Sequence, residues 1–373
     1  MTYRIVGSAA LATSLLLYYN RNLRYLLQRK ETCLFALLLI WVYYYVKEIT
    51  QYFIPRIRGF NLRQLDLVHR HRYDLPEFID KGFSDLSRDE NLWRIMHERF
   101  TYAAAQGFRP YMEDRMHYMY DPNLNLAIFG IFDGHGGMYI SDYLECHFAV
   151  SLRHRLMRLK QKLKMHNKSS SLADDPISEA VITQVFELDD AISRLDKKYT
   201  SLTGSTLICA ILEKNRFLTI INVGDSRAVA CDMFNRAVAL SRDHKPDDRE
   251  ERRRVEVAGG FVNCDDDGSP RIQGILSVSR AFGDTLLKRL GVLTARPDVQ
   301  RIDLHKKPLK FLIVGTDGFW DVVTNSEAIK LANEFLKSRE GKRDWHRIST
   351  YLVQLALERQ SKDNVSVLFL KLY

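Results

Sequence analysis

Apolar runs bounded by turn-forming residues recur along the C-terminal three-quarters of the chain and predict strands. The run Phe217–Val223 is apolar on both faces in part, which is typical of a strand covered on both sides inside a layered domain. Similar runs predict strands at Phe100–Ala105, Leu124–Phe132, Ser205–Leu212, Ala228–Cys231, Phe311–Thr316 and Val365–Leu372.

Longer segments of mixed polarity between these runs predict helices. The longest are Met138–Leu163, Ile177–Lys198, Ser326–Ser338 and Asp344–Gln360, the last two with Ser326 and Asp344 as N-caps. Shorter helices are expected at Pro76–Lys81 and Asn91–Glu98, and Leu163–Pro176 reads as a flexible connector. Because strands dominate the middle and helices come in pairs, the pattern favours a sandwich of sheets covered by helices.

Two apolar runs near the N-terminus have a different character. Ile5–Tyr19 and Thr32–Val46 are each 15 residues long, shorter than the ~20 residues of a straight membrane span. The second run ends in Trp and Tyr residues, which suit a lipid–water interface, and basic residues flank it. We interpret residues 1–54 as a transmembrane anchor with its main apolar run at 32–46. A buried core helix, or a cleaved signal peptide from the first run, are the alternatives.

The positive charge is concentrated at the same end of the chain. The formal net charge is +9, and eleven Lys and Arg against three acids give residues 1–72 a charge of +8. The remaining residues are close to neutral, which excludes a typical nucleic-acid binder. We interpret residues 55–98 as a basic juxtamembrane linker that can lie against an anionic leaflet. Equal charge on both sides of the second run leaves its orientation open.

The five cysteines do not form a recognisable framework. Their number is odd, they are widely spaced and no CxxC pair occurs. This excludes a disulfide scaffold and a zinc ribbon, and it favours a reducing compartment. We therefore expect the large domain, residues 99–373, to lie in the cytosol.

Acidic residues recur beside small or turn-forming residues, and most follow an apolar run. They are Glu113-Asp114, Asp133, Asp225, Asp317 and Asp363. Carboxylates at the ends of buried strands repel each other when they converge, unless cations lie between them. The sequence therefore predicts a site for two or more hard divalent metals.

Eight motifs surround these acids and occur in a fixed order. They are Arg109–Arg115, Asp133–Gly137, Gly204–Thr206, Val223–Arg227, Asp243–Pro246, Val278–Asp284, Thr316–Asp321 and Asp363–Ser366. In this order the chain resembles the metal-dependent type-2C serine/threonine protein phosphatases over about Phe100–Tyr373. Its N-terminal segment, Arg24–Thr32 with the apolar run that follows, is similar to membrane-anchored members of that family.

The resemblance implies an α+β fold with a central antiparallel β-sandwich flanked by helix pairs (α-β-β-α), and a metal centre at one end. Asp133 would bridge two Mg²⁺ or Mn²⁺ ions, and the Gly134 carbonyl would bind the first. Asp317 and Asp363 would hold the second ion. Glu113 and Asp114 would act near the first ion through water. Asp225, with Asp317 or Asp321, resembles a weaker third site.

The implied reaction is hydrolysis without a covalent phosphoenzyme. Two metals lower the pKa of a shared water, and the resulting hydroxide would attack phosphorus in line. Arg109 can grip two phosphate oxygens with its planar fork. His135 would protonate the departing serine or threonine oxygen. Cys146 is followed by His147 rather than by a phosphate loop, so a cysteine phosphatase is excluded.

Other charged residues carry less information. Asp284 is evenly balanced between structural support and a role in the site, and Asp243-His244 reads as a structural turn. Glu251 and Arg254 are spaced for a helical salt bridge, and Arg271 is a weaker candidate for approaching substrate.

Together these features predict a membrane-tethered phosphatase of phosphoserine and phosphothreonine proteins, with a monomeric catalytic domain. The resemblance alone suggests the endoplasmic reticulum. A catalytically silent phosphoprotein-binding scaffold and a two-metal nuclease are the rivals. The complete set of acids argues against the first, and the near-neutral domain argues against the second.

Overall fold

The computed structural model describes residues 41–43, 87–89, 92–165, 176–265 and 268–372. The expected anchor, apart from the helical residues Trp41–Tyr43, and the expected helix Pro76–Lys81 lie outside them. So does most of the Leu163–Pro176 connector, although Leu163 itself is still helical. Within the described segments no helix combines the length and the apolarity that a bilayer crossing requires.

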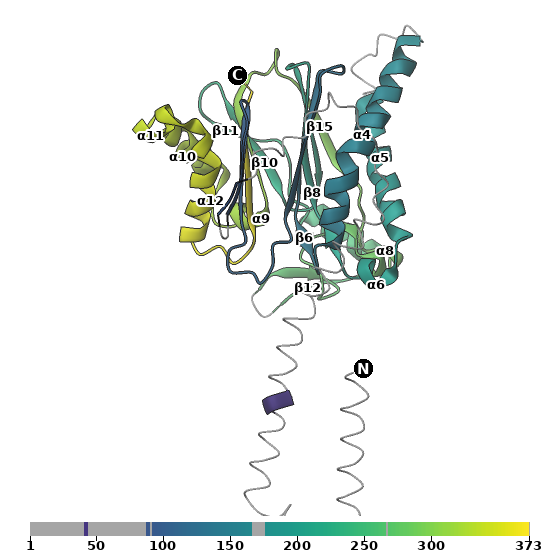
Figure 1. The fold of residues 1–373 in the computed structure, drawn as a ribbon. Coiled ribbons are helices and arrows are strands. Elements are labelled where there is room, and N and C mark those ends of the chain that lie inside the picture. Colours follow the sequence, from purple (N-terminus) through teal and green to yellow (C-terminus); the bar gives the residue numbers. More distant parts are fainter. Residues whose placement is uncertain (1–40, 44–86, 90–91, 166–175, 266–267, 373) are drawn as a thin grey trace, which may run out of the picture. The chain divides into compact units, whose positions relative to one another are not determined.

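Two antiparallel sheets face each other at the centre of the large domain (Figure 1). One sheet has five strands in the order β15-β9-β8-β5-β4. These strands are β4 (Arg115–Asp121), β5 (Leu126–Phe132), β8 (Leu207–Glu213), β9 (Phe217–Val223) and β15 (Asp298–Asp303).

The other sheet has seven strands in the order β1-β2-β3-β17-β16-β10-β11. They are β1 (Ser87–Asp89), β2 (Leu92–Met96), β3 (Phe100–Ala105), β10 (Arg227–Asp232), β11 (Ala237–Ala239), β16 (Leu309–Gly315) and β17 (Val365–Lys371). Between the sheets lies a buried apolar layer that includes Ile131, Ile220, Val314 and Leu368. The central strands β3, β5, β8, β16 and β17 also bury side chains on their other faces, which explains the near-continuous apolar runs of the sequence.

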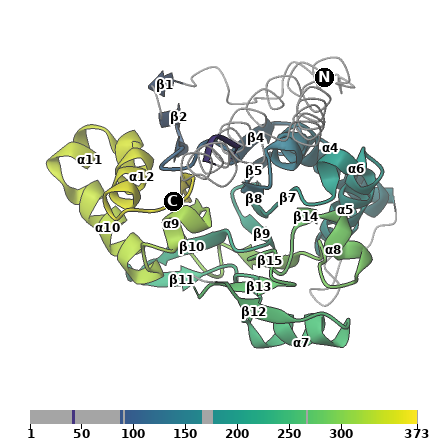
Figure 2. The ribbon, with the colours of Figure 1, turned by 90° about the horizontal axis from the view of Figure 1, so that it is seen from below.

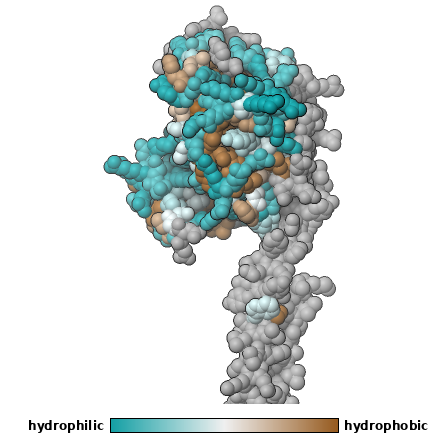
Figure 3. All heavy atoms as spheres, turned by 90° about the vertical axis from the view of Figure 1, so that its left-hand side faces the viewer, coloured by the Kyte–Doolittle hydropathy of each residue, from teal (hydrophilic) through white to brown (hydrophobic). Residues whose placement is uncertain are grey.

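Helices cover the outer face of each sheet. α4 (Tyr139–Met165) and α5 (Pro176–Ser193) pack on the five-stranded sheet through a second apolar cluster. α10 (Asn325–Lys337) and α12 (Ile348–Glu358) cover the seven-stranded sheet. The α-β-β-α layering is therefore confirmed. Seen from the side of α10 and α12, hydrophilic residues surround a central apolar area (Figure 3).

A small lobe and a short ribbon complete the domain (Figure 2). The lobe contains α7 (Arg249–Val257), β12 (Val262–Cys264) and β13 (Pro270–Ile272), with a small apolar core of its own. The three-stranded ribbon has the order β14-β7-β6. It consists of β6 (Gly134–His135), β7 (Gly204–Ser205) and β14 (Phe282–Gly283), and α8 (Thr285–Arg289) follows it. The remaining helices are α6 (Lys197–Thr200), α9 (Asp317–Trp320), α11 (Arg339–Arg343) and the 3₁₀ helix η2 (Trp345–Arg347).

Several local expectations need correction. The helix expected at Asn91–Glu98 is wrong, because β2 forms there and pairs with β3, so the sheet extends N-terminal to Phe100. Ser326 does not cap α10, since the Thr324 side chain accepts the Glu327 backbone N–H instead. Asp344 does act as a cap, but of η2 rather than of α12.

One buried ion pair joins the five-stranded sheet to its covering helix. Arg153 of α4 donates from Nε to Asp121 at the end of β4, over 2.6 Å, and both side chains are at least 94% buried (exposed fractions 6% and 1%). Asp121 also accepts the backbone N–H groups of Asn123 and Leu124, so it closes the β4–β5 turn.

We predict that Asp121→Ala lowers the free energy of unfolding by about 3–5 kcal/mol, because it leaves the buried Arg153 without its partner. The exposed pair Arg194–Asp190 provides the matched control, and Asp190→Ala should cost less than about 1 kcal/mol. Urea unfolding of both variants measures the difference. Equal losses would show that the buried pair has no special role.

Candidate metal centre

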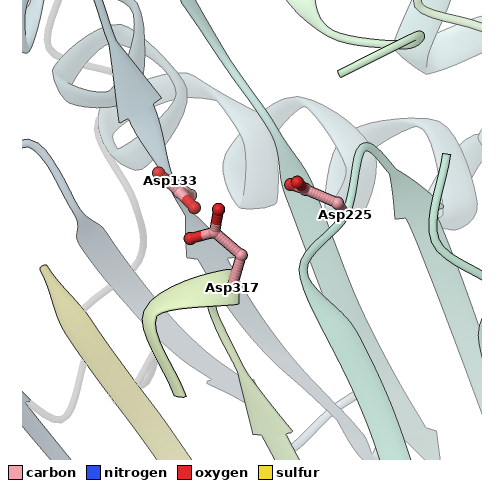
Figure 4. Close-up of side chains that lie close together, drawn as sticks. All are labelled: Asp133, Asp225 and Asp317. Carbon is pink, nitrogen blue, oxygen red and sulfur yellow. The ribbon is translucent and has the colours of Figure 1, made fainter. Parts of the chain in front are cut away.

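Three carboxylates from distant parts of the chain converge at one end of the sandwich. Asp133 follows β5, Asp225 lies in the turn between β9 and β10, and Asp317 begins α9 directly after β16. Each offers an oxygen within 4.8 Å of the others. Figure 4 shows the carboxylates of Asp133 and Asp317 pointing toward each other, with the side chain of Asp225 extending toward them from the turn after β9. The adjacent ends of strands from both sheets therefore build one cluster.

Backbone contacts fix the turn that carries Asp133. Thr206 donates its backbone N–H to the Asp133 carbonyl over 2.8 Å, which ties this turn to β7 and β8. The next residue is Gly134, where a Cβ would lie 2.6 Å from Ser141 Oγ and 2.7 Å from the Glu113 carbonyl. A side chain there would push the Asp133 turn away from the Glu113 loop. The glycine is therefore required for this close approach.

The Glu113-Asp114 loop is held against the start of β17. Asn364 accepts the Glu113 backbone N–H over 2.7 Å, and its amide nitrogen donates to the carbonyls of Gln106 and Tyr111. The buried Asp114 accepts hydrogen bonds from Ser366 Oγ (2.7 Å) and Thr316 Oγ1 (3.2 Å). Asn364 and Ser366 thereby set the position of both acids.

Two of the predicted metal ligands form ion pairs at the rim of the cluster. Asp363 pairs with Arg109 over 2.6 Å, and Asp321 pairs with Lys245 over 3.1 Å. Within the described part of the chain, Asp133, Asp225 and Asp317 form no ion pair. The structure thus places all the predicted acids at this end of the domain, but it brings only three of them together as a cluster.

Burial and mutual repulsion raise the pKa values of the clustered acids. Burial comes first for Asp133 and Asp225, and the neighbouring carboxylates add to it, so both pKa values lie well above the usual range. The same causes raise the pKa of Asp114 to about 7 and that of Asp317 to about 6, despite opposing hydrogen bonds. Since each unit of raised pKa is about 1.4 kcal/mol against the charged form, the ionised cluster is strained.

The donor set fits hard divalent cations. Every converging side chain offers a carboxylate oxygen, and the described residues place neither a thiol nor an imidazole in the cluster. Oxygen ligands suit Mg²⁺ and Mn²⁺, and positive charge between the acids would remove their repulsion. The donor atoms of the cluster therefore fit a hard divalent cation.

His135 lies beside the cluster and has a partner that the sequence left undecided. Its Nε2 lies 2.7 Å from Asp284 Oδ2, and Asp284 is buried just before α8. In the sequence Asp284 directly follows Phe282-Gly283, which alone does not identify a partner 149 positions away. Asn364, Ser366, Thr206 and Lys245 lie within the sequence motifs, but the sequence alone indicated no contact for them.

The remaining charged candidates have structural partners. The Glu251–Arg254 salt bridge is confirmed at 3.1 Å, and Glu251 also binds Arg280 over 2.6 Å. Asp243 pairs with Arg227 over 2.6 Å. Arg271 pairs with Asp265 over 2.7 Å within the small lobe.

Comparison with known proteins decides the family. A sequence model of protein phosphatase 2C matches residues 98–365. The chain belongs to the protein phosphatase 2C family. It is 33% identical to protein phosphatase 1L of Bos taurus over 368 residues, which are 96% of either chain. It is 36% identical to a probable protein phosphatase 2C 59 of Oryza sativa subsp. japonica, over 73% of this chain and 75% of that protein.

Solved structures share the fold of this phosphatase domain. The serine-threonine phosphatase 2C of Toxoplasma gondii superposes with a TM-score of 0.62 at 21% identity, covering 79% of this chain and 98% of that one. A sex determining protein of C. elegans gives a TM-score of 0.62 at 24% identity, over 74% of this chain and 64% of its own. Family membership and these relatives identify the chain as a serine/threonine phosphatase.

The raised pKa values predict how metal and pH act on stability. Asp114 and Asp317 hold protons in the folded state at pH values where the unfolded chain, with an Asp pKa near 3.8, has released them. Without metal, these groups therefore lower the free energy of unfolding as pH rises from about 4 to about 7. A divalent cation should restore it, so Mg²⁺ should raise the melting temperature more at pH 8 than at pH 5.

The matched variant for this measurement is Asp317→Asn, which mimics the protonated acid. In EDTA at pH 8 it should unfold with a free energy about 1–3 kcal/mol higher than the wild type, and it should lose much of the Mg²⁺ response. A Mg²⁺ shift that is equal at both pH values, or larger at pH 5, would contradict the assignment of the cluster as the metal site.

Proposed function

We propose that this serine/threonine phosphatase hydrolyses phosphoserine and phosphothreonine in proteins with two divalent cations held at the acidic cluster, and that its N-terminal segment tethers it to a membrane. The observation that carries the first part is the convergence of Asp133, Asp225 and Asp317 on adjacent strand ends. Buried carboxylates this close together repel each other when ionised, and a bound cation would remove that repulsion.

The ligands are assigned by matching motifs onto this geometry. Asp133 would lie between two ions, with the Gly134 carbonyl on the first. Asp317 and Asp363 would hold the second. Asp225 and Asp321 would contribute to a weaker third site, and Glu113 and Asp114 would act through water. When bound, such cations lower the pKa of water and neutralise phosphate charge.

Arg109 is proposed to bind the phosphate of the substrate. Its side chain is 51% exposed, and one guanidinium nitrogen binds Asp363 while Nε donates to the Lys362 carbonyl over 3.2 Å. These contacts orient the planar fork and leave its other edge for two phosphate oxygens. Arg109 would thus select a phosphate and align it with the acids.

His135 is proposed as the general acid. The imidazole follows Asp133 by two positions and remains 26% exposed, so a substrate oxygen can reach it. Loss of an alkoxide from phosphorus is slow unless a proton is supplied, because the serine or threonine oxygen is a poor leaving group. His135 would supply that proton.

The silent-scaffold alternative is not favoured. A scaffold that had lost catalysis would be expected to lack an acid of the cluster or the basic group that holds phosphate. Asp133, Asp225, Asp317 and Arg109 are all in place at one end of the sandwich.

We predict that Asp317→Asn abolishes metal-dependent phosphate release from a phosphothreonine peptide, with a loss of at least about 100-fold in kcat/KM. Removal of one carboxylate weakens cation binding and the charge stabilisation that cations give. Asp303→Asn is the control. Asp303 is the last residue of β15, at the end away from the acidic cluster, and it pairs with Arg216. The activity of this control variant should equal that of the wild type. Full activity of Asp317→Asn would refute the site assignment.

The membrane proposal is supported by sequence features outside the described residues. The apolar runs Ile5–Tyr19 and Thr32–Val46 have basic flanks, and short spans suit the thinner bilayer of the endoplasmic reticulum. The cysteines in the described part of the chain are free thiols, in keeping with a cytosolic catalytic domain.

We predict that the full-length chain stays in the membrane fraction through alkaline carbonate extraction, whereas a chain lacking residues 1–54 is extracted and keeps its phosphatase activity. The reason is that the anchor, not the folded domain, buries its apolar surface in lipid. A truncated chain that fails to fold would instead place the apolar runs in the core of the protein. Release of the full-length chain by carbonate would contradict the tether.

A further inference from the structure

We propose that Asp284 is a positioning residue for catalysis, which holds the His135 imidazole with Nε2 toward Asp284, so that the protonated ring gives its Nδ1 proton to the departing alcohol oxygen. The contact is direct, with His135 Nε2 lying 2.7 Å from Asp284 Oδ2. The carboxylate is 3% exposed, so water screens this contact little. The inference rests on the proposed function, since it deepens the role of His135 in that reaction.

The backbone of Asp284 is strained in a way that serves this contact. Asp284 has φ +44°, in the left-handed region, which costs a non-glycine residue roughly 1–2 kcal/mol. It occupies the N-cap position of α8, yet its side chain makes no capping hydrogen bond. An aspartate at this position usually accepts from the helix N–H groups. Here the carboxylate turns to His135 instead, and strain kept at such a point indicates a functional constraint.

The absence of a side chain at Gly204 leaves room in the ribbon for the His135–Asp284 pair. On β7, Gly204 pairs with His135 of β6 on one side and with Gly283 of β14 on the other. A Cβ on Gly204 would collide with both Asp284 Oδ2 and His135 Nε2. The three strands therefore place the acid and the imidazole side by side across a position where only glycine fits.

A separate anchor holds the loop that carries Asp284. Asp189 of α5 accepts the Gly283 backbone N–H over 3.1 Å and forms an ion pair with Lys288 of α8. Asp284 itself donates its backbone N–H to the Thr203 carbonyl over 3.0 Å. The loop is thus fixed by contacts that do not involve His135, so the His135–Asp284 pair is not needed to hold the loop.

The geometry assigns separate tasks to the two imidazole nitrogens. Nε2 faces Asp284, and among the described residues Nδ1 has no hydrogen-bond partner, which leaves Nδ1 for the substrate. A buried carboxylate beside one ring nitrogen fixes the orientation of the imidazole and directs the proton of that nitrogen toward itself. In the reaction, water oxygen bonds to phosphorus and the bond to the alcohol oxygen breaks with its electron pair left on that oxygen. His135 gives this oxygen a proton, which one of the two water protons replaces.

The test compares two leaving groups in the full-length protein. Asp284→Asn should lower kcat for a phosphothreonine peptide by about 10–100-fold, because general acid catalysis is worth about 10²–10⁴ in rate and part of it is lost. With p-nitrophenyl phosphate the loss should stay below about threefold, since the phenolate leaves without a proton. KM should be unchanged for both. A loss that is equal for both substrates would overturn the proposal.

Two further variants separate positioning from loop structure. His135→Gln should show the same selectivity, and adding Asp284→Asn to it should lower kcat no further, because the acid acts through the imidazole. An additional tenfold loss in the double variant would overturn the proposal. Asp189→Asn is the matched control, since it loosens the same loop without touching His135. Its loss should differ less between the two substrates than that of Asp284→Asn, because the Asp284 carboxylate is retained.

A measurement on the wild type covers the case in which the substituted proteins do not fold. The imidazole ¹⁵N chemical shifts of His135, identified by comparison with the shifts of the other histidines, should show that the neutral ring carries its proton on Nε2, toward Asp284. The opposite tautomer would overturn the proposal. A wild-type protein that releases no phosphate with metal would instead refute the proposed function, whatever the tautomer.

Discussion

The repulsion among buried carboxylates is the constraint on which the rest of this structure depends. Asp133, Asp225 and Asp317 are carried by strands of both sheets, and each is fixed by the strand or turn that ends at it. Burial raises their pKa values, so the cluster opposes folding whenever it is ionised without a cation. The apolar layers of the sandwich supply the rigidity that holds the acids in place, and a divalent cation would turn their repulsion into attraction.

Basic side chains of the protein form ion pairs with the acids at the rim of the cluster. Arg109 and Lys245 pair with Asp363 and Asp321 at the rim. The carboxylates also act on Lys245. Burial alone would lower the pKa of Lys245, but the nearby carboxylates of Asp225 and Asp321 more than offset burial, so the pKa is raised. The chain's own cations thus pair with these two outer acids, whereas the inner three form no ion pair among the described residues.

Strands were predictable where apolar residues run without interruption, as at Phe217–Val223, and were missed where polar residues are buried. Strand β4 contains Arg115 and Asp121, which are buried only because Asp142 and Arg153 of α4 pair with them. Those partners lie on a helix that must first be packed on the sheet. A local pattern cannot report such a pairing, because it depends on the tertiary arrangement that it helps to stabilise.

The three clustered acids, Asp133, Asp225 and Asp317, could be identified from the sequence, because each lies beside a glycine near the end of an apolar run. The sequence could not show which acids converge and which form ion pairs, since that depends on the directions of their side chains in the folded protein. Asp284 illustrates the limit most clearly. Its role depends on a positive φ and on the missing side chain of Gly204, and both are properties of the folded ribbon. Proteins often depart from local rules at functional positions, and Asp284 departs from N-cap behaviour in this way.

Phosphate release from a phosphothreonine peptide by the full-length protein, measured in EDTA and after adding back Mg²⁺ or Mn²⁺, tests the central claim most directly. No release is expected in EDTA, and recovery is expected with either ion, because a divalent cation can then bind at the acidic cluster. Equal release in EDTA and in metal would contradict the central claim, and so would no release from a folded protein with metal bound.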